Sequence, residues 1–370
     1  MLIVSPIMMN VRCVAAALMI GMTACGGGNE TPTAVRPETP APRTLPTVFP
    51  SAGGTWATIA PASLGWDTTA LNAASDWVGS QQSTAFVVVW QGRIVAERYW
   101  RGWTAATDSI IASAGKSILA TVVGQLQSEG RLSLDAPVTQ YLGAGWSRSP
   151  ATESRITVRH LLQMASGLND SLQVVVQPGT RFYYNNPAYY QLFAIVTRVS
   201  GQDINTATRT RLSTPIGMGG TWRLNIDTGE PGFIYSCTAR DMARFGLLQL
   251  ANGRWDGTRV VDSSWVQQMR QPGPPDNGAY GMLWWLNGSN GYRIPGPYLF
   301  PTQPGMLIPS APRDLIAALG KGDKKIYVVP SLDLVVVRHG AEADVNGGNP
   351  LALSAFDEQL WQRLRAAIRY

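Results

Sequence analysis

The chain has 370 residues, of which 45% are hydrophobic and 15% are charged. This composition excludes an intrinsically disordered protein, because such chains carry too few apolar residues to form a core. The net charge is +6, but the basic residues are scattered and form no basic-aromatic stripe. We therefore expect no nucleic-acid partner.

The first 25 residues predict an export signal. Arg12 precedes an apolar run, residues 13–22, which is too short to span a membrane. Small residues then precede Cys25, and this arrangement resembles a bacterial lipoprotein signal, in which the cysteine carries the lipid. The prediction is a protein held by this lipid at the periplasmic or other extracytoplasmic face of a bacterial cell envelope. Ordinary signal cleavage and an uncleaved anchor are the alternatives.

Residues 26–60 predict a disordered linker. Their first part is rich in Gly, Pro, Thr and Ser, and such a segment cannot pack a core. The folded part of the chain is expected to begin near residue 61. Cys237 is the one cysteine that follows Cys25, so no disulfide is expected within this folded part.

Hydrophobic periodicity, turn residues and capping residues then predict the regular elements of the folded chain. Helices are expected at 67–79, 113–130, the end of 132–142, 155–168, from 187, in 235–251, from 263 and at 350–369. A β-hairpin is expected at 86–99, and further strands are expected at 314–319, 325–329 and 334–337.

The predicted strands lie at both ends of the folded chain, with helices between them. This order indicates an α/β (α+β) protein whose antiparallel sheet is built from both chain ends and flanked by helices. The expected division is a sheet domain of residues 61–110 and 225–370. A mainly helical insertion, residues 111–224, would separate its two parts.

The most informative spacing is Ser113-x-x-Lys116 at the start of an apolar helix. The chain has four lysines among 30 basic residues, and Lys116 is the only lysine before residue 321. Arginine stays protonated in proteins, whereas a desolvated lysine can act as a base. Residues three apart share a helix face, so Lys116 can reach the Ser113 hydroxyl. The alternative is a solvent-facing lysine without a function.

Two further segments are candidates for the same site. Tyr184 and Asn186 are two residues apart in a predicted extended stretch, so their side chains would point the same way. Gly320, Lys321 and Gly322 follow a predicted strand, and glycines let a substrate approach backbone N–H groups closely. The alternative for Tyr184 and Asn186 is an ordinary loop, in which both residue types are frequent. The alternative for residues 320–322 is a tight turn with solvated lysines.

Other chemistries have less support in the sequence. No serine lies in a Gly-x-Ser-x-Gly elbow, and no phosphate-binding glycine loop is present. The two histidines, His160 and His339, are far apart and no cysteine cluster accompanies them, so neither a metal nor a cofactor is expected. His160 is expected to be structural, and His339 is a weaker candidate for the site.

Several stretches together resemble the serine β-lactamase-fold hydrolases, which include class C β-lactamases, penicillin-binding-protein-like carboxypeptidases, and related esterases and amide hydrolases. They match in content and in order over roughly residues 80–340: SAGK at 113–116, LSLDAPV at 132–138, ITVRHLLQMASGL at 156–168, PGTRFYYNNPAYYQL at 178–192, CTARDMARFGLLQLANGRWDG at 237–257, YGMLWW at 280–285 and KIYVVPSLDLVVV at 325–337.

The resemblance implies a β-lactamase/transpeptidase-like fold and a role for each candidate residue. Ser113 would be the nucleophile and Lys116 its activating amine, with Tyr184 and Asn186 as the tyrosine and asparagine of the Tyr-x-Asn motif. The third motif of the family, usually Lys-Thr-Gly or His-x-Gly, is replaced by Gly320-Lys321-Gly322. This form is similar to a glycine-rich variant of the esterase and oligomer-amide hydrolase members.

The sequence therefore predicts a lipid-anchored serine hydrolase that acts on a small ester, amide or peptide through an acyl-enzyme on Ser113. An esterase or amidase is the favoured interpretation. A β-lactamase or D-alanyl carboxypeptidase is the alternative within the fold. A non-catalytic envelope binding protein is the alternative of another class.

Overall fold

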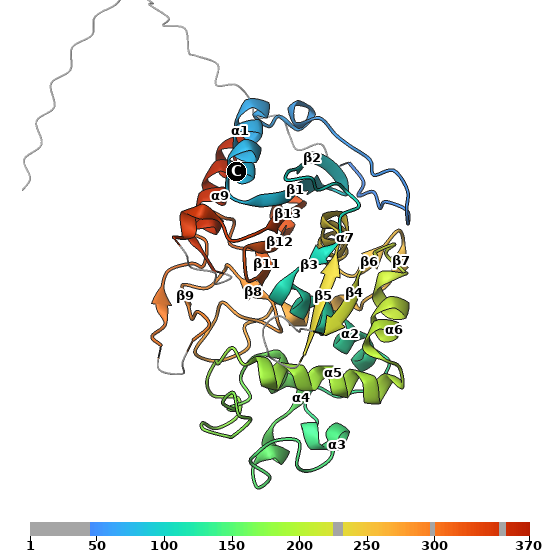
Figure 1. Ribbon diagram of the computed structural model, residues 1–370, viewed down its shortest axis with the longest axis vertical. Coiled ribbons are helices and arrows are strands. Elements are labelled where there is room, and N and C mark those ends of the chain that lie inside the picture. The colour runs from blue at the N-terminus through green and yellow to red at the C-terminus, as the bar shows by residue number, and fades with distance from the viewer. Residues whose placement is uncertain (1–44, 225–231, 297–299, 348–352) are drawn as a thin grey trace, which may run out of the picture. The chain divides into compact units, whose positions relative to one another are not determined.

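The computed structural model describes residues 45–224, 232–296, 300–347 and 353–370 (Figure 1). The predicted export signal, Cys25 as the predicted lipid attachment site, and most of the predicted linker lie outside these described residues. Within these ranges no helix is both long and apolar enough to cross a membrane.

A six-stranded antiparallel sheet forms the centre of the fold, with the strand order β2-β1-β13-β12-β11-β8. Strands from both ends of the folded chain lie side by side, which confirms the predicted sheet. Its strands are β1 (Ser83–Trp90), β2 (Arg93–Tyr99), β8 (Trp285–Leu286), β11 (Ile316–Gly320), β12 (Lys324–Val329) and β13 (Leu334–Gly340).

Helices cover both faces of this sheet because its central strands are apolar on both faces. Neighbouring residues of a strand point to opposite sides. Tyr327 of β12 contacts Trp361 of the C-terminal helix α9 (Ala355–Ile368), whereas Ile326 lies beneath Gly246 of α7 (Ala239–Leu250). The N-terminal helix α1 (Thr68–Ser80) packs beside α9 (Figure 1).

The remaining helices lie mostly between β3 and β13 along the chain, as the sequence predicts, and the longest of them are α2 and α5. A small sheet of order β3-β5-β4, which was not predicted, joins this region. The elements are β3 (Ser109–Ile110), α2 (Gly115–Ser128), α3 (Val138–Leu142), α4 (Val158–Leu162), α5 (Asn186–Ser200), α6 (Ile204–Thr208), β4 (Thr221–Leu224), β5 (Phe233–Cys237), β6 (Arg254–Trp255), β7 (Thr258–Arg259), α8 (Ser263–Met269), β9 (Gly291–Tyr292) and β10 (Gln303–Pro304).

One predicted helix is shorter than expected. The apolar pattern predicts a helix over 155–168, but α4 has only five residues. Thr157 caps its start, and His160 completes a capping box. Met164 then adopts a positive φ of 55°, which no helix accommodates, and the rest of the predicted segment becomes an irregular connection.

Candidate active site

Ser113 and Lys116 lie at the start of α2, where one 3₁₀ turn (Ala112–Ala114) leads into the helix. The Lys116 amine donates a hydrogen bond to Ser113 Oγ, with 3.2 Å between Nζ and Oγ. Lys116 is only 6% exposed. The residue before the serine, Ala112, has a positive φ of 49°. Such backbone strain is costly for a non-glycine residue and clusters at functional sites.

Aromatic rings surround the Lys116 amine. Its Nζ lies 4.3 Å from the centre of the Tyr189 ring and 5.2 Å from the centre of the Tyr184 ring. The negative face of an aromatic ring attracts a cation, so these rings can hold the Lys116 side chain beside Ser113.

The Tyr184 hydroxyl reaches the same serine. It is hydrogen-bonded to the Ser113 side chain, and burial, opposed by that bond, raises the pKa of Tyr184 well above its usual value. The neutral phenol is therefore the favoured form in the free protein. The ring is fixed from behind by Trp285 of β8, which stacks on it at an interplanar angle of 14°.

The two asparagines that follow Tyr184 have different positions. Asn185 is buried and structural, because its Oδ1 caps α5 through the Ala188 N–H and its Nδ2 donates to the carbonyl of Leu168. Asn186 is the first residue of α5 and lines the same cavity as Ser113. The structure therefore brings Tyr184 and Asn186 to one site, but Asn186 begins a helix and does not lie in the predicted extended stretch.

The turn after β11 closes the site from the opposite side. A Cβ on Gly320 would lie 2.3 Å from the Ile111 carbonyl and 3.2 Å from the Ala114 nitrogen. Only glycine permits this close approach to the Ser113 segment. Lys321 lines the cavity, whereas Gly322 does not and instead accepts a hydrogen bond from Arg338 through its carbonyl.

A cavity of about 370 Å³ joins these groups. Four aromatic side chains and one isoleucine are half of its ten described lining residues, and no carboxylate is among them. The tyrosine-rich segment 183–190 is the one sequence signal for this wall. Trp222, Phe233 and Ile234 lie on β4 and β5, which the sequence does not predict. The lining residues are Ala112, Ser113, Lys116, Asn186, Tyr189, Tyr190, Trp222, Phe233, Ile234 and Lys321.

Known proteins are similar to this chain in sequence and in fold. The sequence profile of the family described as Beta-lactamase matches residues 76–339. The chain belongs to the Beta-lactamase family. This match covers both the strands of the central sheet and the segment that carries Ser113 and Lys116.

Individual relatives of this Beta-lactamase family member are distant. It is 26% identical to a 6-aminohexanoate-dimer hydrolase from Paenarthrobacter ureafaciens, in an alignment that covers 57% of this chain and 66% of that protein. It is 28% identical to penicillin-binding protein 4 of Amycolatopsis lactamdurans, in an alignment that covers 46% of this chain and 58% of that protein. The chain thus spans less than two thirds of the length of each of these two relatives.

The fold itself recurs in solved structures. A protein from Bacteroides dorei DSM 17855, provisionally named a β-lactamase, superposes with a TM-score of 0.65 at 19% sequence identity. The superposition covers 82% of this chain and 100% of that one. At this identity the similarity establishes the β-lactamase/transpeptidase-like fold and not the substrate.

Neither histidine of this family member lines the cavity. His160 accepts a hydrogen bond from the Thr157 N–H within the α4 cap, which agrees with the structural role predicted for it. His339 is buried, its Nε2 bonds the Ile110 carbonyl at 3.0 Å, and burial lowers its pKa to about 3. The described residues also contain no group of three or more His, Cys, Asp or Glu placed to hold a metal.

Proposed function

We propose that this Beta-lactamase family member is a serine hydrolase that cleaves a small amide or ester through an acyl-enzyme on Ser113. The observation that carries the proposal is the convergence of Lys116 and Tyr184 on one serine hydroxyl. A nucleophile and a base within hydrogen-bond reach are the geometric requirement for covalent catalysis by serine. The cavity of about 370 Å³ suits a small molecule.

In the proposed first half-reaction, Ser113 Oγ attacks the substrate carbonyl and its proton passes to Lys116 in the neutral form. Lys116 is favoured as the first acceptor because the raised pKa keeps Tyr184 protonated. The oxyanion would lie between the N–H groups of Ser113 and Lys321, whose segments face each other across Gly320. The Tyr184 hydroxyl then protonates the leaving amine or alcohol and recovers a proton from Lys116.

In the second half-reaction, a water molecule attacks the acyl-enzyme. The same pair of side chains, Lys116 and Tyr184, takes the proton of the water and returns one to Ser113 Oγ as the ester bond breaks. The products are a carboxylic acid and the restored serine. The reaction therefore balances without a metal or a cofactor.

Two observations favour an amidase or esterase over a β-lactamase. The curated name of one relative, 6-aminohexanoate-dimer hydrolase, describes hydrolysis of a linear amide. The turn Gly320-Lys321-Gly322 replaces the Lys-Thr-Gly or His-x-Gly that the resemblance leads us to expect. A β-lactamase or D-alanyl carboxypeptidase is the second candidate, because the Lys321 ammonium at the cavity could hold a substrate carboxylate.

The test compares hydrolysis of p-nitrophenyl butyrate, a 6-aminohexanoate dimer and a chromogenic cephalosporin by wild type and Ser113→Ala. We expect turnover of the ester or the linear amide, its complete loss in Ser113→Ala, and loss of labelling by a fluorophosphonate. Ser128→Ala, an exposed serine of the same helix, is the matched control and should be unaffected. Cephalosporin turnover alone would favour the second candidate. Absence of both turnover and labelling would indicate a non-catalytic binding protein.

Lys116→Arg separates the charge of Lys116 from its basicity. Arginine keeps the positive charge but cannot accept the serine proton. We expect turnover to fall to near the level of Ser113→Ala. Turnover close to that of wild type would remove Lys116 from the mechanism.

The lipid anchor at the envelope remains a separate proposal based on the sequence around Cys25. Cys25→Ala should move the full-length protein from the membrane fraction to the soluble fraction of a bacterial lysate. Retention of the variant in the membrane fraction would contradict the anchor.

A further inference from the structure

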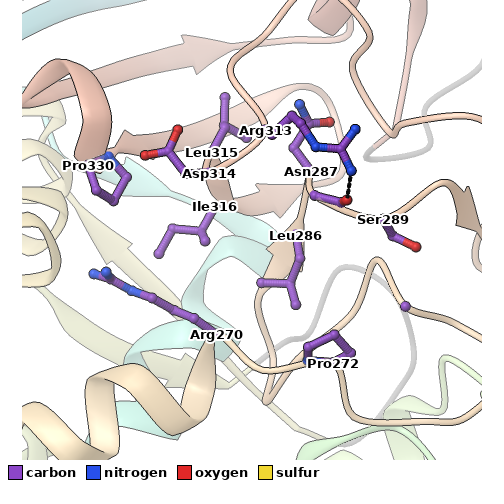
Figure 2. A pocket seen from close by; sticks show the side chains of 12 residues that line it. Arg270, Pro272, Leu286, Asn287, Ser289, Arg313, Asp314, Leu315, Ile316 and Pro330 are labelled. Carbon is purple, nitrogen blue, oxygen red and sulfur yellow. Dashed lines mark hydrogen bonds between the residues drawn. The ribbon is translucent and has the colours of Figure 1, made fainter.

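A second cavity, of about 470 Å³, lies apart from the candidate active site (Figure 2). None of the residues that line it lines the Ser113 cavity. Strand alternation separates the two cavities. Leu286 and Ile316 are paired across β8 and β11 and both line the second cavity, whereas Trp285 points the other way and stacks on Tyr184.

The walls of this cavity are mainly apolar, and two of its polar groups are already occupied. The Asn287 amide donates to the carbonyls of Ile308 and Pro312 and accepts from the Ile308 N–H. The Asp314 carboxylate accepts from the N–H and the hydroxyl of Ser331. Neither group is therefore available to recognise a ligand.

Two arginines provide the remaining charge. Arg270 extends from the end of α8 below Ile316, and Arg313 lies on the opposite side of the cavity (Figure 2). Arg313 donates to the Gly288 carbonyl at 2.6 Å. Arg270 donates to the Gln249 carbonyl, and its buried Nε has no hydrogen-bond partner.

The positive charge of Arg270 is less well compensated by its surroundings than that of Arg313. Burial lowers its pKa to about 10, and the charge of Asp314, which lines the same cavity, opposes this effect without an ion pair between these two described side chains. A partly buried cation without a counter-ion is costly. The cavity therefore combines apolar walls with an uncompensated guanidinium, which complements an anion that has an apolar body.

We propose that this second cavity binds a small apolar carboxylate, whose carboxylate group pairs with the Arg270 guanidinium and whose hydrocarbon part contacts Leu286 and Ile316. A planar carboxylate matches the fork of guanidinium N–H groups. A volume of about 470 Å³ is within the usual range for small-molecule pockets. This site does not depend on the function proposed for Ser113.

The experiment is calorimetric titration of the purified protein with octanoate, octanol and inorganic phosphate. We expect octanoate to bind, and octanol and phosphate to bind at least about tenfold more weakly. Octanol lacks the negative charge, and phosphate lacks the hydrocarbon part. Arg270→Met keeps the length of the side chain and removes the charge, so it should weaken octanoate about tenfold or more. Arg254→Met removes an exposed arginine elsewhere and should leave the affinity unchanged.

Lys321→Met identifies the cavity that is occupied, since a carboxylate could also bind beside Ser113. Octanoate affinity should be unchanged in this variant. A loss of binding in Lys321→Met, equal affinities for octanoate and octanol, or octanoate found only beside Ser113 in a crystal of the complex would each overturn the proposal. The last two measurements use the wild-type protein, so the proposal stays testable even if Arg270→Met does not fold.

Discussion

The two segments that face each other across the candidate active site are held in place by different forces. The nucleophile segment depends on apolar packing: every residue of α2 from Gly115 to Leu126 is buried, and its polar side chains bond mostly to backbone carbonyls, as Ser117 does to Leu283 at 2.6 Å. The turn Gly320–Asp323 depends instead on buried charges.

Arg338 and Asp323 provide these charges. The Arg338 guanidinium, which is fully buried, donates to the carbonyls of Gly322 and Asp323 at 3.0 Å each and to that of Ala341 at 2.7 Å. The Asp323 carboxylate accepts from Lys325 at 3.1 Å and from the Ser354 hydroxyl at 2.7 Å. The backbone that presents Lys321 to the cavity is thus fixed by side chains behind it.

This difference determines how much stability each segment loses on substitution. A packed helix loses stability in proportion to the volume that a substitution adds or removes. A buried charge network loses stability abruptly, because removing one member takes a counter-charge away from partners that stay charged. We therefore expect graded effects at the nucleophile segment and large effects at the turn.

Tyr184→Phe should have the largest effect, and it acts on chemistry without altering either segment. The phenyl ring keeps the stacking on Trp285, but the hydroxyl that reaches Ser113 is lost. Proton transfer by a positioned side chain contributes about 10²–10⁴-fold, so kcat should fall by about that factor with the unfolding free energy nearly unchanged. Steady-state kinetics on the substrate identified above and denaturant titration test both parts. A loss of stability similar in size to the loss of kcat would show a structural role instead.

Asp323→Ala tests the charged turn. It leaves Lys325 and Arg338 without this carboxylate, and breaking a buried pair in this way costs about 3–5 kcal/mol. Urea denaturation at neutral pH measures the loss. Asp135→Ala, which breaks the exposed pair with Arg159, is the matched control and should cost about 0–1 kcal/mol. Equal losses in the two variants would contradict the contrast between the segments.

The unfolding free energy lost in Asp323→Ala should depend on pH. Burial alone would raise the pKa of Asp323, but Lys325 and the hydrogen bonds from Ala343 and Ser354 outweigh it and hold the pKa below its usual range. The ionised carboxylate therefore stabilises the fold above its unfolded pKa of about 3.9, and this contribution is lost as pH falls through the lower folded pKa. The stability difference between wild type and Asp323→Ala should narrow below about pH 4.

The sequence predicts these two segments unequally, for a physical reason. The hydrophobic periodicity of helix α2 is local in the sequence. Its start, its buried face and the Ser113–Lys116 contact could therefore be predicted. The network behind Gly320–Asp323 depends on residues that are distant in sequence, since Arg338 and Ser354 meet the turn only through strand pairing and the start of α9. The aromatic wall from Trp222 and Phe233 was missed for the same reason, since it depends on the unpredicted sheet β3-β5-β4.

Gly124→Ala tests the packed segment and should have a smaller effect. A Cβ at this position would lie 1.9 Å from Nε1 of the buried Trp265, so the indole must shift. Overpacking of this kind costs about 1–3 kcal/mol, although the higher helix propensity of alanine offsets part of the loss. Ser128→Ala, at the exposed end of the same helix, should be nearly neutral. An unchanged unfolding free energy in Gly124→Ala would show that the contact relaxes freely.

Lys321→Met should have the smallest effect, because it changes the turn's side chain and leaves its backbone intact. Lys321 is exposed, and no ion pair links it to a described carboxylate, so stability should not change. Its ammonium can attract only a substrate that carries a negative charge near the scissile bond. We expect KM to rise up to about tenfold for an anionic amide or ester and to stay constant for a neutral one, with kcat retained in both cases. A matched fall in kcat for both substrates would place Lys321 in the chemical step, and the turn would then contribute a side chain as well as a backbone N–H.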